Sequence, residues 1–125
     1  MSATALVGVA VAGALGASAR YLVDRLVRQR TRGPFPWGTL LVNVSGSFVL
    51  GLVTGAALYH GFGGDPKVWL ATGFCGAYTT MSTFAFETVR LIEEGDTGPA
   101  LVNLAVSLAL GFGAAAVGLA LVSVR

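Results

Sequence analysis

The chain has 125 residues, of which 54% are hydrophobic and 11% are charged, and its formal net charge at pH 7 is +2. Soluble domains carry roughly 25% charged residues, so this composition argues against a water-soluble globule. The small, scattered charge argues against a nucleic-acid partner. The length leaves no room for a separate nucleotide-binding or catalytic domain, so we expect no enzyme activity and no catalytic residues.

Every Lys, Arg, Asp and Glu lies outside four uncharged stretches, which cover residues 1–19, 33–64, 68–86 and 97–124. A transmembrane helix needs ~20 predominantly apolar residues. We therefore predict an all-α membrane protein with a single domain over residues 1–125. Its four transmembrane helices are expected at about residues 4–22, 37–59, 68–89 and 99–122.

The first predicted span ends near Arg20, whose side chain is expected either to snorkel to the interface or to raise the local anion concentration. The next segment, residues 24–36, combines several arginines with Gly33, Pro34 and Pro36, so we predict a basic turn there. Basic residues are more numerous on this side of the membrane than on the other: Arg25, Arg28, Arg30, Arg32 and Arg90 against Lys67 and Arg125. The positive-inside rule then places both termini outside.

Small residues recur at four-residue spacing in three of the predicted helices: Gly8, Ala12 and Gly16; Ser47, Gly51 and Gly55; Ser107, Gly111 and Ala115. In lipid, helices associate through close packing and interhelical hydrogen bonds, which small residues permit. These stripes predict close helix contacts, either within one bundle or between subunits of an oligomer.

Polar residues form two further stripes inside the predicted spans. Thr39, Asn43 and Ser47 share one face of the second span, and Asn103 and Ser107 share one face of the fourth. Neutral donors without a central carboxylate describe a path that holds an anion and still releases it. Hydrogen bonding between helices is the alternative interpretation of each stripe.

The third span contains the sequence GFCGAYTTMSTF at residues 73–84, which places two glycines beside a run of hydroxyl residues. Glycine lowers helix stability by roughly 1 kcal/mol, and Ser and Thr side chains bond the backbone. We therefore predict a break around residues 76–80, where freed carbonyls line a cavity or meet an ion. A kinked but continuous helix is the alternative.

Phe84 follows the run of hydroxyl residues. The edge of its ring suits a desolvated anion, although packing is the alternative role.

These residues resemble the Fluc (CrcB) fluoride channels of bacteria. The resemblance rests on GASARY at residues 16–21, GTLLVN at 38–43, GSF at 46–48 and the segment 73–84. It implies an antiparallel, dual-topology dimer of four-helix subunits in the bacterial inner membrane, with passive export of fluoride that protects the cell. The positive-inside bias leaves open a homodimer or a heterodimer with an oppositely oriented paralogue.

The resemblance also implies site residues. The pore and fluoride contacts would come from Asn43, Phe84, Met81, Ser82, Thr83, Ser107, Thr39 and Arg20. A structural sodium ion at the dimer centre would be held by the backbone carbonyls of Gly76 and Thr79. Met81 stands where the family usually has a phenylalanine.

Our leading hypothesis is therefore a fluoride-selective channel. Two alternatives remain at this point: a small multidrug or cation exchanger, and a packing subunit of a larger membrane complex. An exchanger would need an essential intramembrane acid, and Glu87 at the end of the third span is the candidate.

Overall fold

The computed structural model describes residues 2–124, and this part of the chain is helical. Within it, three helices are long and apolar enough to cross a membrane: α1 (Ala3–Arg30), α2 (Trp37–His60) and α6 (Thr97–Ser123). The segment between α2 and α6 is interrupted. Its pieces are α3 (Gly64–Val68), the π-helix η1 (Trp69–Cys75), α4 (Gly76–Tyr78) and α5 (Met81–Glu93).

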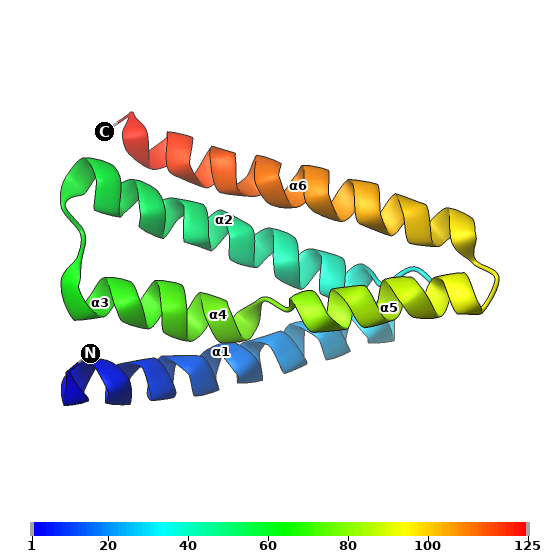
Figure 1. The fold of residues 1–125 in the computed structure, drawn as a ribbon, viewed down its shortest axis with the longest axis horizontal. Helices are drawn as coiled ribbons and strands as arrows, with labels where there is room; N and C mark the ends of the chain where they lie inside the picture. The colour runs from blue at the N-terminus through cyan, green and yellow to red at the C-terminus, as the bar shows by residue number, and fades with distance from the viewer. Residues whose placement is uncertain (1, 125) are drawn as a thin grey trace.

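The segments run alternately in opposite directions. Figure 1 shows α1 leading away from the N-terminus, α2 returning, the pieces α3 to α5 leading away again and α6 returning. Both ends of the described chain therefore lie at one end of the bundle. The C-terminal end of α1 and the C-terminal end of α5 lie at the other end.

Helix α1 is longer than the predicted first span, because it continues to Arg30. The basic turn expected over residues 24–36 is therefore wrong for residues 24–30, which are helical, and the chain leaves the helix only at Thr31. Hydropathy marks where a helix leaves the bilayer, whereas leucine and arginine sustain helix beyond it. The turn then contains Gly33, which has a positive φ of 90°.

Helices α2 and α6 form the most extensive pairing in the fold. A Cβ added at Gly51 would overlap the carbonyl oxygen of Ala115, and one added at Gly118 would overlap that of Phe48. Gly55 approaches Leu119 in the same way. The stripe of small residues in α2 therefore packs against another helix of the same chain. Of the two alternatives, contacts within one bundle and contacts between subunits, this is the first.

Helix α1 packs mainly on η1 and α4. A Cβ at Gly8 would overlap the Trp69 indole, and one at Gly16 would overlap the carbonyl oxygen of Phe74. The close approach of Gly73 to Val9 and Ala12 completes this contact. The α1 stripe also serves packing within the bundle.

The predicted break is present, at the C-terminal end of the expected window. Gly76 and Ala77 remain helical in α4, whereas Thr79 (φ −79°, ψ 157°) and Thr80 (φ −147°, ψ 117°) are extended. The Thr80 hydroxyl accepts a hydrogen bond from the Thr83 N–H and so caps the N-terminus of α5. The hydroxyl run thus starts a new helix as well as ending the old one, and a continuous kinked helix is excluded.

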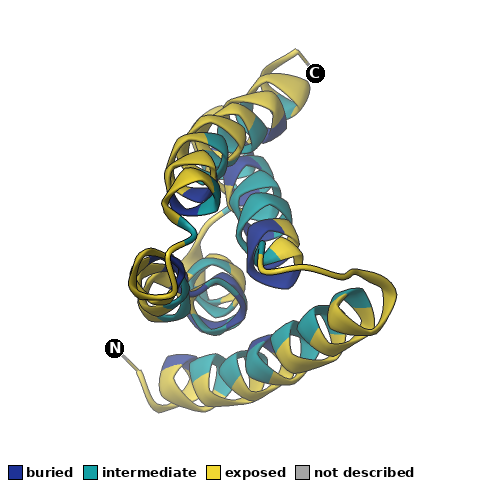
Figure 2. Cartoon of the chain, turned by 90° about the vertical axis from the view of Figure 1, so that its right-hand side faces the viewer, coloured by how far each residue is buried: buried dark blue, intermediate teal, exposed yellow. Residues whose placement is uncertain are grey.

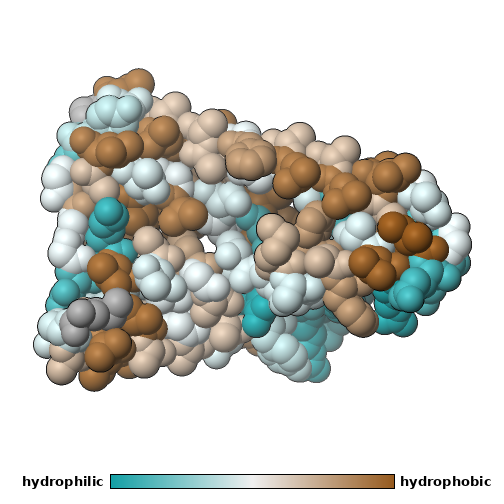
Figure 3. Space-filling model, in the orientation of Figure 1, coloured by the Kyte–Doolittle hydropathy of each residue, from teal (hydrophilic) through white to brown (hydrophobic). Residues whose placement is uncertain are grey.

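The outer surface is strongly apolar. Figure 2 shows exposed residues along the outer faces of α1 and α6 and buried residues turned inward, and Figure 3 shows apolar side chains along the edge formed by α6. Phe112 is 75% exposed, and leucines and valines are exposed on every long helix. Soluble monomers rarely expose such continuous apolar surface, so this is the surface of a membrane protein.

Candidate functional site

A groove of about 440 Å³ runs beside the break, and we call it the break groove. Side chains from α2, α6 and the interrupted segment line it, and none of the lining residues carries a formal charge. Six of the predicted site residues are among them: Asn43, Gly76, Thr79, Met81, Phe84 and Ser107. More than half of the predicted site residues therefore line one cavity.

Asn43 pairs with the backbone at the break. Its Nδ2 donates to the Thr80 carbonyl oxygen at 2.9 Å, and the Thr80 N–H donates to its Oδ1 at 2.8 Å. One side-chain amide thus satisfies both backbone polar groups of an extended residue, which would otherwise be costly to keep away from water. Sequence analysis left two roles open for Asn43, an anion contact and hydrogen bonding between helices, and these two bonds are of the second kind. The second hydrogen on Nδ2 is not used by these two bonds.

The break frees the carbonyls at the end of α4 from their helical partners, and for two of them the reason can be identified. In an uninterrupted helix, the Thr80 N–H would donate to the Gly76 carbonyl and the Thr83 N–H to the Thr79 carbonyl. Here the Thr80 N–H donates to Asn43, and the Thr83 N–H donates to the Thr80 hydroxyl. Gly76 and Thr79, the predicted sodium ligands, are the residues whose carbonyls lose these partners.

These residues fit a cation that prefers oxygen ligands, because Gly76 and Thr79 both line the break groove and carbonyl oxygens suit hard cations. Among the described residues there is no group of His, Cys, Asp and Glu side chains that could hold a metal ion. The oxygen atoms beside the break come from backbone carbonyls and from neutral hydroxyl and amide side chains.

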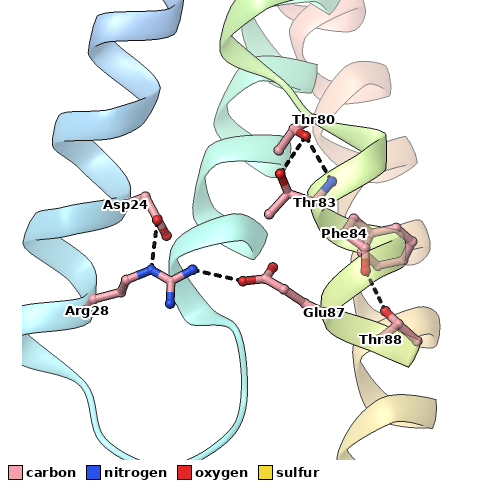
Figure 4. Close-up of polar contacts among 7 residues, drawn as sticks. All are labelled: Asp24, Arg28, Thr80, Thr83, Phe84, Glu87 and Thr88. Carbon is pink, nitrogen blue, oxygen red and sulfur yellow. Dashed lines mark hydrogen bonds and ion pairs between the residues drawn. The ribbon is translucent and has the colours of Figure 1, made fainter. Parts of the chain in front are cut away.

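The hydroxyls of the run point mostly at neighbouring protein atoms. Thr79 donates to the Cys75 carbonyl at 2.8 Å. Thr80 donates to the Thr83 hydroxyl at 3.0 Å (Figure 4). Ser82 is exposed and is not among the residues that line the break groove or the cavity beside Arg20 described below. The run therefore shapes the break first, and Thr80 and Thr83 are its members that line the second cavity.

Met81 and Phe84 lie on the first turn of α5 and differ sharply in burial. The Phe84 ring is 8% exposed, whereas Met81 is 72% exposed. Both line the break groove, so the groove has one enclosed aromatic ring and one open thioether wall. A polarizable thioether adapts its shape but lacks the positive ring edge of phenylalanine.

A chain of hydrogen bonds joins α6 to α5 behind the groove. Ser107 donates to Asn103 Oδ1 at 3.1 Å, Asn103 Nδ2 donates to the Thr88 hydroxyl at 2.9 Å, and Thr88 donates to the Phe84 carbonyl at 2.8 Å. Asn103 is 1% exposed. Asn103 therefore serves hydrogen bonding between helices, which was the alternative interpretation of its stripe. Ser107 takes part in the same series of hydrogen bonds and also lines the break groove.

A second cavity of about 240 Å³, the Arg20 cavity, lies between α1, α2 and the start of α5. Arg20, Asp24, Thr39, Thr80 and Thr83 contribute its polar lining. The predicted stripe on α2 is therefore divided: Thr39 faces the Arg20 cavity, whereas Asn43 and Ser47 face the break groove. The predicted pore residues other than Ser82 are thus divided between two cavities, and Thr80 lines both cavities.

Sequence reasoning missed an ion-pair triad between α1 and α5 (Figure 4). Arg28 Nε contacts Asp24 Oδ2 at 2.7 Å, and Arg28 Nη2 contacts Glu87 Oε2 at 2.8 Å. The four-residue spacing of Asp24 and Arg28 is a helical pairing signal, but the predicted turn obscured it. Glu87, which sequence analysis named as the candidate acid of an exchanger, has a side chain only 14% exposed.

Comparison with known proteins gives consistent matches. Residues 7–119 match the family described as CrcB-like protein, Camphor Resistance (CrcB). The chain is 46% identical over 119 residues to fluoride-specific ion channel FluC 1 of Leifsonia xyli, covering 95% of this chain and 87% of that protein. It is 49% identical to the FluC 1 of Frankia casuarinae over 89% of this chain and 91% of that protein. The FluC 2 of Mycobacterium tuberculosis is 45% identical over 90% of this chain and 86% of that protein.

Proposed function

Since this chain belongs to the CrcB family, we propose that it is a fluoride-specific ion channel, which lets fluoride leave the cell passively and so protects it from the anion. The observation that carries the proposal is the break groove. Its lining is uncharged, it contains the Asn43 amide and the Phe84 ring, and it lies beside an interrupted helix. Neutral donors hold an anion weakly enough to release it.

The two alternative functions lose their support. The curated relatives are named fluoride-specific ion channels, and an ion channel is not an enzyme, an exchanger or a packing subunit. The candidate acid of an exchanger, Glu87, is engaged by Arg28 and does not line the break groove. We therefore retain the channel alone.

The first prediction tests the function directly. Purified protein in liposomes loaded with potassium fluoride is expected to release fluoride when valinomycin is added, because potassium then balances the charge. A fluoride electrode measures the release. Liposomes loaded with potassium chloride and read with a chloride electrode are the control, and they are expected to retain their anion. Retention of fluoride would contradict the proposal.

We propose further that the channel is a dual-topology dimer of four-crossing subunits in the bacterial inner membrane. The interrupted segment α3 to α5 would be the crossing that the three apolar helices leave unassigned. The break groove supports a dimer, because Met81 and Phe112 line it while remaining 72% and 75% exposed. The arginines near the ends of α1 and α5 bias one orientation, so the partner is either a second copy or an oppositely oriented paralogue.

The dimer centre is the proposed place of a structural sodium ion, held by the Gly76 and Thr79 carbonyls of both subunits. The ion would neutralise carbonyl dipoles that the break leaves without helical partners. In this proposal sodium stabilises the assembly and is not transported. The chemistry of these freed carbonyls supports the site, because carbonyl oxygens suit hard cations.

The second prediction concerns the removal of sodium. An ion that binds only the folded assembly stabilises it by about 2.7 kcal/mol at a concentration 100 times its dissociation constant. Replacing sodium with N-methylglucamine at constant ionic strength is therefore expected to lower the melting temperature in detergent and the fluoride flux in liposomes. Restoring sodium should recover both. Equal stability and flux in the two salts would exclude a structural sodium ion.

A further inference from the structure

Helix α5 separates from α1 after the break. Helix α1 packs closely on η1 and α4 but much less on α5. The Arg20 cavity opens between them, and a neighbouring cavity of about 340 Å³ lies further along, lined in part by Arg28, Glu87 and Arg90. Among the described residues, the pair of Arg28 and Glu87 is the one side-chain hydrogen bond that joins α1 to α5.

Between α1 and α5, the carboxylates of Asp24 and Glu87 share one ion-pair partner, the Arg28 guanidinium. Asp24 lines the Arg20 cavity and Glu87 lines the neighbouring cavity, and each gives one oxygen to Arg28. The remaining oxygens, Asp24 Oδ1 and Glu87 Oε1, are buried without a hydrogen-bond partner in the described part of the chain. Breaking a partly buried ion pair leaves an uncompensated charge, and this costs more free energy than the loss of an exposed pair.

The position of Asp24 is built into the fold. Its Oδ1 lies against Gly38, where an added Cβ would overlap it. Gly38 is in the first turn of α2, and the N-terminus of a helix favours negative charge. The carboxylate is thereby held at the edge of the same cavity that contains Arg20, where an unneutralised negative charge opposes the attraction of an anion.

We propose that Arg28 determines how strongly the Arg20 cavity attracts an anion, because it neutralises negative charge on Asp24 and Glu87. This inference rests on the proposed channel function. With Arg28 in place, the triad contributes one net negative charge, and Arg20 offsets it. Without Arg28, Asp24 and Glu87 both lose their partner, and the summed charge of the triad and Arg20 changes from zero to one net negative charge, so the local potential becomes negative. Charge in a cleft changes the local ion concentration by about tenfold or more.

The test is fluoride efflux from liposomes at two ionic strengths. Arg28→Gln is expected to lower the initial rate about tenfold at roughly 0.01 M salt, where the Debye length is about 30 Å, and much less at roughly 1 M, where it is about 3 Å. The triple variant Arg28→Gln, Asp24→Asn, Glu87→Gln is expected to recover the wild-type rate. A purely structural role of Arg28 would not give this dependence on salt.

Arg25→Gln is the matched control, because it removes one positive charge from an exposed position on the same helix, and it is expected to keep the wild-type rate. Size-exclusion chromatography checks that each variant is folded. A wild-type rate in Arg28→Gln, or a loss that the triple variant does not reverse, would overturn the inference while leaving the channel function intact. A wild-type protein that releases no fluoride would instead overturn the function on which the inference rests.

Discussion

Asn43→Leu is expected to lower fluoride efflux at least about a hundredfold, which corresponds to about 2.7 kcal/mol at 1.36 kcal/mol per factor of ten. Leucine keeps the approximate volume but removes both hydrogen bonds to Thr80. The Thr80 N–H and carbonyl would then lie unpaired beside the break groove, at a cost of about 1–3 kcal/mol for each group. The fluoride electrode on reconstituted liposomes measures the effect.

Ser47→Ala is the control for this variant. Ser47 lies one turn further along α2 and lines the same groove, so the substitution removes a polar atom without touching the break. We expect a loss of at most about threefold, which is about 0.6 kcal/mol at 1.36 kcal/mol per factor of ten and lies near the lower end of the net contribution of one hydrogen bond. A variant Asn43→Leu that conducts as well as Ser47→Ala would show that the pairing with Thr80 is dispensable for conduction.

Gly118→Val is expected to lower the free energy of unfolding by about 3 kcal/mol. A Cβ at this position would overlap the Phe48 carbonyl oxygen and crowd the backbone of Gly51 and Leu52. Since the atoms that it meets are backbone, the helices α2 and α6 must move apart to make room. Thermal or denaturant unfolding in detergent, followed by circular dichroism, measures the loss.

Gly113→Val provides the comparison within the same helix. A Cβ at Gly113 meets no atom within 4 Å, and the residue is exposed. Its effect is expected to be within about 0.5 kcal/mol, as for surface substitutions in general. Equal destabilisation by the two valines would attribute the effect to helix propensity and would refute close packing of α2 on α6.

Local chemistry predicted the helical class, the approximate extent of the long helices and the existence of the break. These features depend on apolar length and on residues adjacent in sequence, so composition and spacing contain the necessary information. The predicted end of α1 was wrong because hydropathy reports where a helix leaves the bilayer. The helix continues beyond that point, and Arg28 lies on this continuation. The π-helical turns of η1 have no local signal that we identified.

The site was predicted as a set of residues but not as an arrangement. Asn43 and Thr80 are separated by 37 residues, and Arg28 and Glu87 by 59. Which acceptor each polar group finds at such separations depends on how the helices pack, not on spacing along one helix. For the same reason the sequence could place Thr39 and Asn43 on one stripe but could not show that they face different cavities.

The pairing of Asn43 with Thr80 makes the interruption a rigid joint and not a hinge. A side-chain amide reproduces, with two hydrogen bonds, what a missing turn of helix would have provided, so the extended residues have one preferred conformation. A hinge would have to be reordered each time an ion passed, whereas this joint is already preorganised. Any opening and closing of the pathway is therefore expected to involve movement of whole helices and not flexing at residues 79–80.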